Sequence, residues 1–120
     1  MSEQTVQFNV RLTVNDGRFD AFEEIARTMI AGTLKEPGAL GYEWYLSRDR
    51  RRCHLIEDYK NASAVQAHIE SAVVRNLVPK LLEVSTIDSF HVYGDPGPKA
   101  AEALTGMGAE ILPFWQGLGR

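Results

Sequence analysis

The sequence predicts an α+β fold with the element order βαββαβ. Four short segments alternate apolar with polar residues or are rich in β-branched and aromatic residues, which is typical of strands. Two longer segments carry apolar residues at a spacing of three to four, which is typical of amphipathic helices. Clusters of glycine, proline, asparagine and aspartate separate these segments, so each is expected to be an element of its own.

The first strand and helix are predicted within residues 6–35. The strand rests on the strict alternation of Val6, Phe8, Val10, Leu12 and Val14 with polar residues. The turn residues Asn15-Asp16-Gly17 follow and offer an N-cap for a helix from about residue 18 to residue 35. Pro37 and Gly38 are expected to end this helix.

A hairpin is predicted next. Leu40 to Leu46 alternate in the manner of a strand, and a second run ends at Tyr59. The polar loop Arg48-Asp49-Arg50-Arg51 between them is short enough to join antiparallel neighbours.

The second helical region and the last strand complete the pattern. Helical spacing from residue 65 to residue 82 is interrupted near Glu70-Ser71 and again at Pro79, which predicts two short helical pieces meeting at an angle. Thr86 to Tyr93 is β-branched and aromatic enough for a fourth strand, which residues 94–98 end.

This order is that of the ferredoxin-like motif, with a four-stranded antiparallel sheet and both helices on one face. The other face is open to water unless something covers it, and self-association is the simplest cover. We assign residues 1–94 to this domain and residues 95–120 to a C-terminal extension. The extension is expected to hold a short helix near Lys99 to Leu104 and an apolar segment, Ile111 to Trp115, that packs on this subunit or on its partner.

Size, charge and cysteine content restrict the class of protein. A chain of 120 residues fits one domain, and a net charge of −3 does not favour a nucleic-acid binder. The single cysteine, Cys53, indicates a reducing compartment. Neither a leader pattern nor an apolar run of about 18 residues is present, so we expect a cytoplasmic protein that does not enter a membrane.

The stretch from Glu36 to Ser71, EPGALGYEWYLSRDRRRCHLIEDYKNASAVQAHIES, resembles the core signature of the antibiotic biosynthesis monooxygenase family. The shared features are a Glu-Pro-Gly before the second strand, a Glu-aromatic pair closing the third, and an Ala-His-hydrophobic-x-Ser in the next helix. The matching elements cover roughly residues 5–94. The resemblance implies a homodimeric α+β barrel and oxygenation of quinols or polycyclic phenols by O₂ without a cofactor or metal.

Two residues are the candidates for catalysis. His68 occupies the histidine position of the motif, and histidine titrates near neutral pH, as a base for a phenolic proton must. Glu57 precedes Asp58, and adjacent strand residues point to opposite faces, so one of the two can face the helices. Glu57 shares its face with Leu55 and Tyr59, which predicts a buried carboxyl with a raised pKa or a partner such as His68. The alternative for both is a structural, hydrogen-bonded role.

Three aromatic residues are the candidates for substrate binding: Trp44, Tyr59 and Tyr42. They could stack on an aromatic ligand, although alternate aromatics on a strand can also simply be core. The family's haem-degrading branch needs an aromatic at the motif histidine position and an axial histidine about ten residues later. Here those positions hold His68 and Val78, so haem cleavage is not expected.

Four arginines in the predicted hairpin loop, Arg48, Arg50, Arg51 and Arg52, form a basic tip. Proteins that bind single-stranded nucleic acid combine basic grooves with aromatic side chains. Here the aromatic residues lie in the predicted β-strands, apart from the arginines, and the chain is acidic. We therefore expect a solvated tip. The predicted function is a cofactor-independent monooxygenase that acts on a small aromatic substrate and O₂. A dimeric barrel that binds a small hydrophobic ligand without catalysis remains the alternative, and a nucleic-acid-binding domain is a third, weaker one.

Overall fold

The computed structural model describes residues 4–119. The elements along the chain are β1 (Val6–Val14), α1 (Phe19–Thr33), β2 (Ala39–Leu46), β3 (Arg52–Tyr59), α2 (Ala62–Ile69), α3 (Ala72–Val84), β4 (Ser85–Tyr93), α4 (Pro98–Gly106) and β5 (Glu110–Leu112). The first seven elements follow the predicted order βαββαβ, with the second helix divided into α2 and α3. Among the described residues, no helix has the length and apolar content needed to cross a bilayer.

The sheet has five strands in the order β2-β3-β1-β4-β5. Its first three pairings are antiparallel, and β4 pairs with β5 in parallel. The prediction of a purely antiparallel, four-stranded sheet is therefore wrong. Helix α4 carries the chain back along β4, and only such a crossover lets β5 run parallel to it. A three-residue strand is too short to show a period of two, so the sequence pattern did not reveal it.

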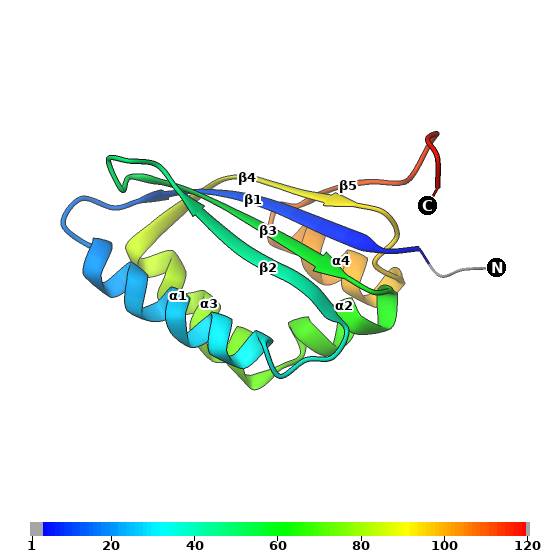
Figure 1. The fold of residues 1–120 in the computed structure, drawn as a ribbon, viewed down its shortest axis with the longest axis horizontal. Helices are drawn as coiled ribbons and strands as arrows, with labels where there is room; N and C mark the ends of the chain where they lie inside the picture. The colour runs from blue at the N-terminus through cyan, green and yellow to red at the C-terminus, as the bar shows by residue number, and fades with distance from the viewer. Residues whose placement is uncertain (1–3, 120) are drawn as a thin grey trace.

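Helices α1, α2, α3 and α4 lie on one face of the sheet, and no helix within residues 4–119 covers the other face (Figure 1). Every second residue of β1, from Val6 to Val14, is buried beneath the helices, as the alternation predicted. Helix α1 buries Phe22, Ala26, Met29 and Thr33 along one stripe. The core also takes in Ala100 and Leu104 of α4, so the C-terminal extension packs against the same hydrophobic cluster as residues before 94.

The break in the second helical region lies where the spacing predicted it. Glu70 is the C-cap of α2, and the Ser71 hydroxyl accepts a hydrogen bond from the backbone N–H of Val74 at the start of α3. Asn61 caps α2 by accepting from the N–H of Ala64 at 2.9 Å. Helix α3 continues through Pro79, so the second predicted interruption does not end the helix.

The predicted N-cap of α1 is wrong. Arg18 occupies that position and its side chain makes no capping hydrogen bond. Asp16 instead forms an ion pair with Arg51 at 2.7 Å, and Gly17 turns the chain at a φ of 74°. The loop residues therefore fasten the start of α1 to the β2–β3 hairpin.

The hairpin tip is ordered by its own polar residues. Asp49 accepts hydrogen bonds from the Ser47 hydroxyl and from the backbone N–H of Arg51. The guanidinium of Arg50 lies 5.0 Å from the ring centre of Phe19, a cation–π contact. Two of the four tip arginines thus have intramolecular partners, Arg50 on Phe19 and Arg51 on Asp16.

The apolar tail lies mostly outside the core of this protomer. Ile111 packs against the core, but Phe114 and Trp115 keep 55% and 85% of their surface exposed. Within this protomer Ile111 therefore packs on the core and Leu112 pairs with Tyr93 through β5, while packing of the segment on a partner stays a prediction.

Candidate active site

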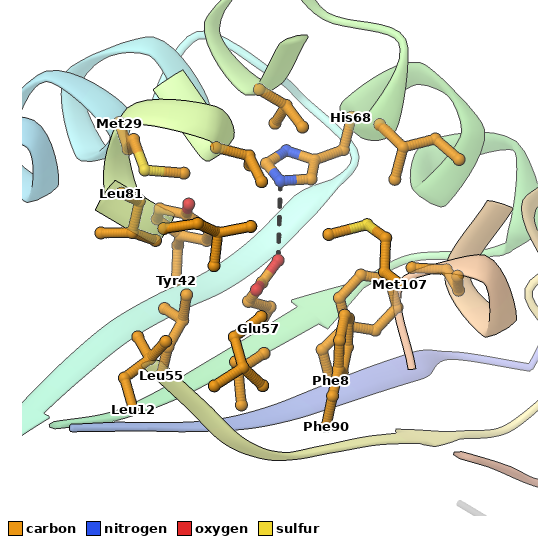
Figure 2. A pocket seen from close by; sticks show the side chains of 17 residues that line it. Phe8, Leu12, Met29, Tyr42, Leu55, Glu57, His68, Leu81, Phe90 and Met107 are labelled. Carbon is orange, nitrogen blue, oxygen red and sulfur yellow. Dashed lines mark ion pairs between the residues drawn. The ribbon is translucent and has the colours of Figure 1, made fainter. Parts of the chain in front are cut away.

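A cavity of about 70 Å³ lies between the sheet and the helices. Most of its lining is apolar and comes from the three strands β1, β3 and β4, from helices α1, α2 and α3, and from the C-terminal extension. Three polar side chains, Tyr42, Glu57 and His68, also line it. Figure 2 shows His68 facing Glu57, with Phe8, Phe90 and Met107 on one side and Met29 and Leu81 on the other. Such a cavity suits an apolar ligand whose polar group meets these three residues.

The strand and helix patterns explain why these side chains meet. Tyr42 and Glu57 are cross-strand partners on β2 and β3, so both point to the helix-covered face. His68 is one helical turn after Val65, and both are buried on the inner side of α2. His68 Nε2 lies 3.5 Å from Glu57 Oε1. The predicted burial of Glu57 and its pairing with His68 are present.

Tyr59 forms the layer behind Glu57. Its hydroxyl donates a short hydrogen bond to Glu57 Oε1, and its ring centre lies 5.1 Å from that of His68. Tyr59 is fully buried and is not among the residues that line the cavity. It therefore contacts the polar group of the site from behind.

Trp44 lies farther along β2, away from the cavity lining. Its ring packs edge-on against Phe22 and Tyr42, at centroid distances of 5.9 Å to each. The structure therefore brings Tyr42, Glu57 and His68 together at the cavity and places Trp44 beside them in the core.

Glu36 is a site residue that the sequence reasoning did not select. Its carboxylate oxygens lie 3.0 and 3.2 Å from His68 Nδ1. Glu36 is the first residue of the Glu-Pro-Gly turn between α1 and β2, which the sequence indicated as a helix stop and as part of the family signature, without a role for the Glu36 side chain. Glu36 lies 32 residues before His68 in the sequence. No helix or strand period links positions that far apart, so only the fold brings the two side chains together.

Burial determines the charge of these groups. Desolvation raises the pKa of Glu57 to about 7, assisted by the nearby charge of Glu36 and opposed by the hydrogen bond from Tyr59. Desolvation also lowers the pKa of His68, against the raising effect of Glu36. Burial and the Glu57 charge raise the pKa values of Tyr42 and Tyr59 well above the ordinary range, so both phenols stay protonated.

The cavity has a mouth between α3 and the end of α4. Leu82 and Met107 both line the cavity and are each 43% exposed, so they reach from the interior to the surface. At about 70 Å³, the cavity is below the ~300–1,000 Å³ of typical ligand pockets. A polycyclic ligand therefore requires the mouth residues to move outward.

Within residues 4–119, no group of three or more His, Cys, Asp or Glu side chains is arranged to hold a metal ion. Cys53 is buried in the core, and burial raises the pKa of its thiol to about 11.

The raised pKa of Glu57 predicts a pH-dependent stability. The folded state retains the proton up to about pH 7, whereas the unfolded chain loses it near 4.5. This contribution is therefore complete below pH 4.5 and is lost as the pH rises toward 7. Glu57→Gln keeps an acceptor for Tyr59 but has no titrating carboxyl, so this loss is absent. Between those pH values its free energy of unfolding should therefore rise relative to that of wild type by on the order of 3 kcal/mol.

Urea unfolding of both proteins at several pH values measures this difference. His68 acts in the opposite direction, since its lowered pKa costs stability below its unfolded value, and it is present in both proteins. Parallel stability curves for the two proteins would show that Glu57 has the same pKa in the folded and unfolded states.

The comparisons with known proteins agree with this fold. The family model for antibiotic biosynthesis monooxygenase matches residues 6–80. The search of curated proteins gives no match. MupZ from Pseudomonas fluorescens is similar in fold, with a TM-score of 0.80 and 21% identity over 98% of this chain and 96% of that one. That likeness extends over the C-terminal extension.

Two further solved structures are similar over less of the chain. A putative antibiotic biosynthesis monooxygenase from Nitrosomonas europaea has a TM-score of 0.69 and 23% identity, covering 82% of this chain and 96% of that one. SnoaB from Streptomyces nogalater, described as a cofactor-independent oxygenase, has a TM-score of 0.65 and 22% identity, covering 78% and 95%. At these identities the structures support the fold, whereas the family match spans more than half of the sequence. The chain belongs to the antibiotic biosynthesis monooxygenase family.

Proposed function

We propose that this protein is a cofactor-independent monooxygenase that uses O₂ to oxygenate a quinol or a polycyclic phenol. The observation that carries the proposal is the group of three polar side chains, His68, Glu57 and Tyr42, in the lining of an otherwise apolar cavity. The family membership and the neighbouring oxygenase support the reaction type.

In the proposed reaction His68 accepts the proton of the substrate hydroxyl at Nε2. The resulting phenolate is electron-rich and can transfer an electron to O₂, so the substrate itself is the reductant. One oxygen atom enters a ring carbon and the other leaves as water. Both hydrogens of that water come from the substrate, one from the hydroxyl and one from the ring carbon, which leaves a quinone.

The residues around His68 have distinct roles in this proposal. Protonated Glu57 and the Tyr42 hydroxyl are donors aimed at the substrate oxyanion. Tyr59 fixes Glu57 by its hydrogen bond. The apolar walls exclude water from the reacting anion, which strengthens these contacts. Trp44 supports Tyr42 from the side.

Oxygen uptake by dialysed protein over a panel of reduced quinones and polycyclic phenols tests the proposal. Each compound needs an autoxidation blank and a blank with heat-denatured protein. Uptake above both blanks, with one oxygen atom from ¹⁸O₂ in the product, is the expected result. Binding of a panel member without uptake would instead identify a non-catalytic ligand-binding barrel.

Substitution at the cavity mouth should discriminate between substrates by size. Met107→Trp is expected to raise KM several-fold for tricyclic phenols and little for monocyclic quinols, because a larger side chain at the mouth obstructs wide ligands first. Leu34→Trp, at a surface position 84% exposed and away from the cavity, is the matched control. Equal KM changes for all substrates in both variants would remove Met107 from the entry route.

The open face of the sheet supports a second part of the proposal, a homodimer in which two sheets pack face to face (Figure 1). This face carries Tyr45 and Tyr93 among polar residues, and both are exposed in the protomer. Sedimentation equilibrium measures the mass directly, and a monomer at micromolar concentration would exclude this assembly.

A further inference from the structure

We propose that Glu36 is the positioning residue of the His68 base. It holds the imidazole with its hydrogen on Nδ1 and leaves Nε2 as the proton acceptor toward the cavity. The kinetic consequence of this inference rests on the proposed function, but the contact and the tautomer are properties of the resting protein.

The distances around the ring determine which nitrogen carries the hydrogen. Glu36 places both carboxylate oxygens within 3.2 Å of Nδ1. A carboxylate can only accept, so Nδ1 must donate. Nε2 lies 3.5 Å from Glu57 Oε1, beyond the usual 2.7–3.2 Å of such hydrogen bonds. That oxygen already accepts from Tyr59, so the Nε2 lone pair is free for a substrate hydroxyl.

The Glu-Pro-Gly turn is fastened in the position that this contact requires. The N–H of Glu36 donates to Thr33 O at 2.9 Å, and its carbonyl accepts from the N–H of Ala39 at 3.1 Å. Lys60, at the end of β3, donates its N–H to Gly38 O at 2.9 Å. A Cβ on Gly38 would lie 2.5 Å from the Cβ of Ala64, so glycine lets the turn pack directly on α2, the helix that carries His68.

The two partners differ in their access to solvent. The His68 side chain is 5% exposed, and that of Glu36 is 19% exposed. Glu36 also lines a surface groove with Lys35, Gly38, Lys60 and Ala64. The carboxylate can therefore stay hydrated on one side while its other side contacts the buried imidazole.

Glu36 is also the residue best placed to stabilise the imidazolium. The titratable groups facing His68 are Glu36 from the turn, Glu57 and Tyr59 from β3, and Tyr42 from β2. Both phenols are neutral, and Glu57 retains its proton up to about pH 7. The last turn of α2, where His68 lies, adds a smaller favourable contribution for a cation.

The proton balance is complete with these residues. The substrate hydroxyl proton moves to Nε2 and gives an imidazolium whose Nδ1–H still contacts Glu36. When water is released, the Nε2 proton passes to the departing oxygen. His68 returns to its neutral form with the hydrogen on Nδ1, ready for the next substrate.

The test uses the intact protein labelled with ¹⁵N-histidine. Of the three histidines, His68 is assigned by the signal lost in His68→Gln. Two-bond ¹⁵N–¹H spectra report which nitrogen is protonated, and a pH titration gives the pKa. We expect the Nδ1–H tautomer in wild type, and in Glu36→Gln a lower pKa of His68 with the tautomer preference lost.

Activity is measured on the same variants. Glu36→Gln should lower kcat by about 10- to 100-fold, as expected for a residue that orients a functional histidine. KM should change little, and the acid limb of the pH profile should move to lower pH. Glu36→Asp keeps the carboxylate and should recover part of both readouts, while Glu43→Gln, an exposed carboxyl on β2, should behave as wild type.

The outcomes separate the two proposals. An Nε2–H tautomer in wild type, or an unchanged His68 pKa in Glu36→Gln, would overturn the role of Glu36 even if oxygen is consumed. The expected spectra together with no oxygen uptake by wild type would support the Glu36–His68 pair and contradict the monooxygenase. A fall in kcat without any spectral change at His68 would also overturn the positioning role.

Discussion

Replacing His68 by glutamine is expected to reduce oxygen uptake by about 10²–10⁴-fold, the usual contribution of a general base. The reason is that His68 is the neutral base that faces the cavity, since Tyr42 and Tyr59 hold their protons and Glu57 is protonated to about pH 7. Glutamine keeps polar atoms near Glu36 but cannot accept and hold a proton. The measurement is initial oxygen uptake, with product analysis, at several pH values.

Two controls accompany this variant. His54→Gln changes an exposed histidine on β3 and should leave the rate unchanged. Far-ultraviolet circular dichroism and urea unfolding show whether His68→Gln is folded under the assay conditions. Turnover equal to wild type in a folded His68→Gln protein would remove this residue from the mechanism and leave the ligand-binding barrel as the better description.

Truncation of Leu104 to alanine should lower the free energy of unfolding by about 2–5 kcal/mol, as expected for a buried leucine whose removal leaves a cavity. Leu104 is only 2% exposed although it lies in the C-terminal extension. It belongs to the core cluster that also contains Phe8 and Phe90, and it lines the cavity. The extension should therefore unfold together with the rest of the chain.

Urea unfolding followed by tryptophan fluorescence and by circular dichroism measures this effect. Leu118→Ala is the matched control, because Leu118 is 83% exposed and surface truncations usually change stability by less than about 0.5 kcal/mol. Two separate unfolding transitions, or a Leu104→Ala protein as stable as the control, would show that the extension does not contribute to the stability of the domain.

Local sequence patterns predicted most of the fold because most of its longer elements have a periodic or capping signal. The alternation in β1 places Phe8, Val10 and Leu12 beneath the helices. Asn61 and Ser71 cap α2 and α3 where the helical spacing restarts. Strand β5 and the parallel pairing escaped prediction because three residues carry no period, and their pairing depends on where α4 returns the chain.

The residues of the candidate site could also be predicted only in part from the sequence. His68 could be chosen from the chemistry of histidine in the motif helix, and Glu57 from the alternation along β3. The structure brings the two side chains together. Glu36 could not be chosen, since its role depends on a turn packed against a helix far along the chain. Trp44 was predicted to bind substrate because strand periodicity places it on the same side of the sheet as Tyr42. Periodicity does not predict where along the strand the cavity lies, since that depends on how the helices pack on the sheet.

By itself the sequence determined the βαββαβ order, the buried face of β1, the inward side of Glu57 on β3, and the family. These follow from interactions between residues close in the chain, or from a motif read directly. Only the tertiary structure decided the fifth strand, the mouth at Met107, and the contact of Glu36 with His68. The physical reason is that these features arise between segments distant in sequence, whose approach depends on how helices and sheet pack, and packing leaves no local periodic signal.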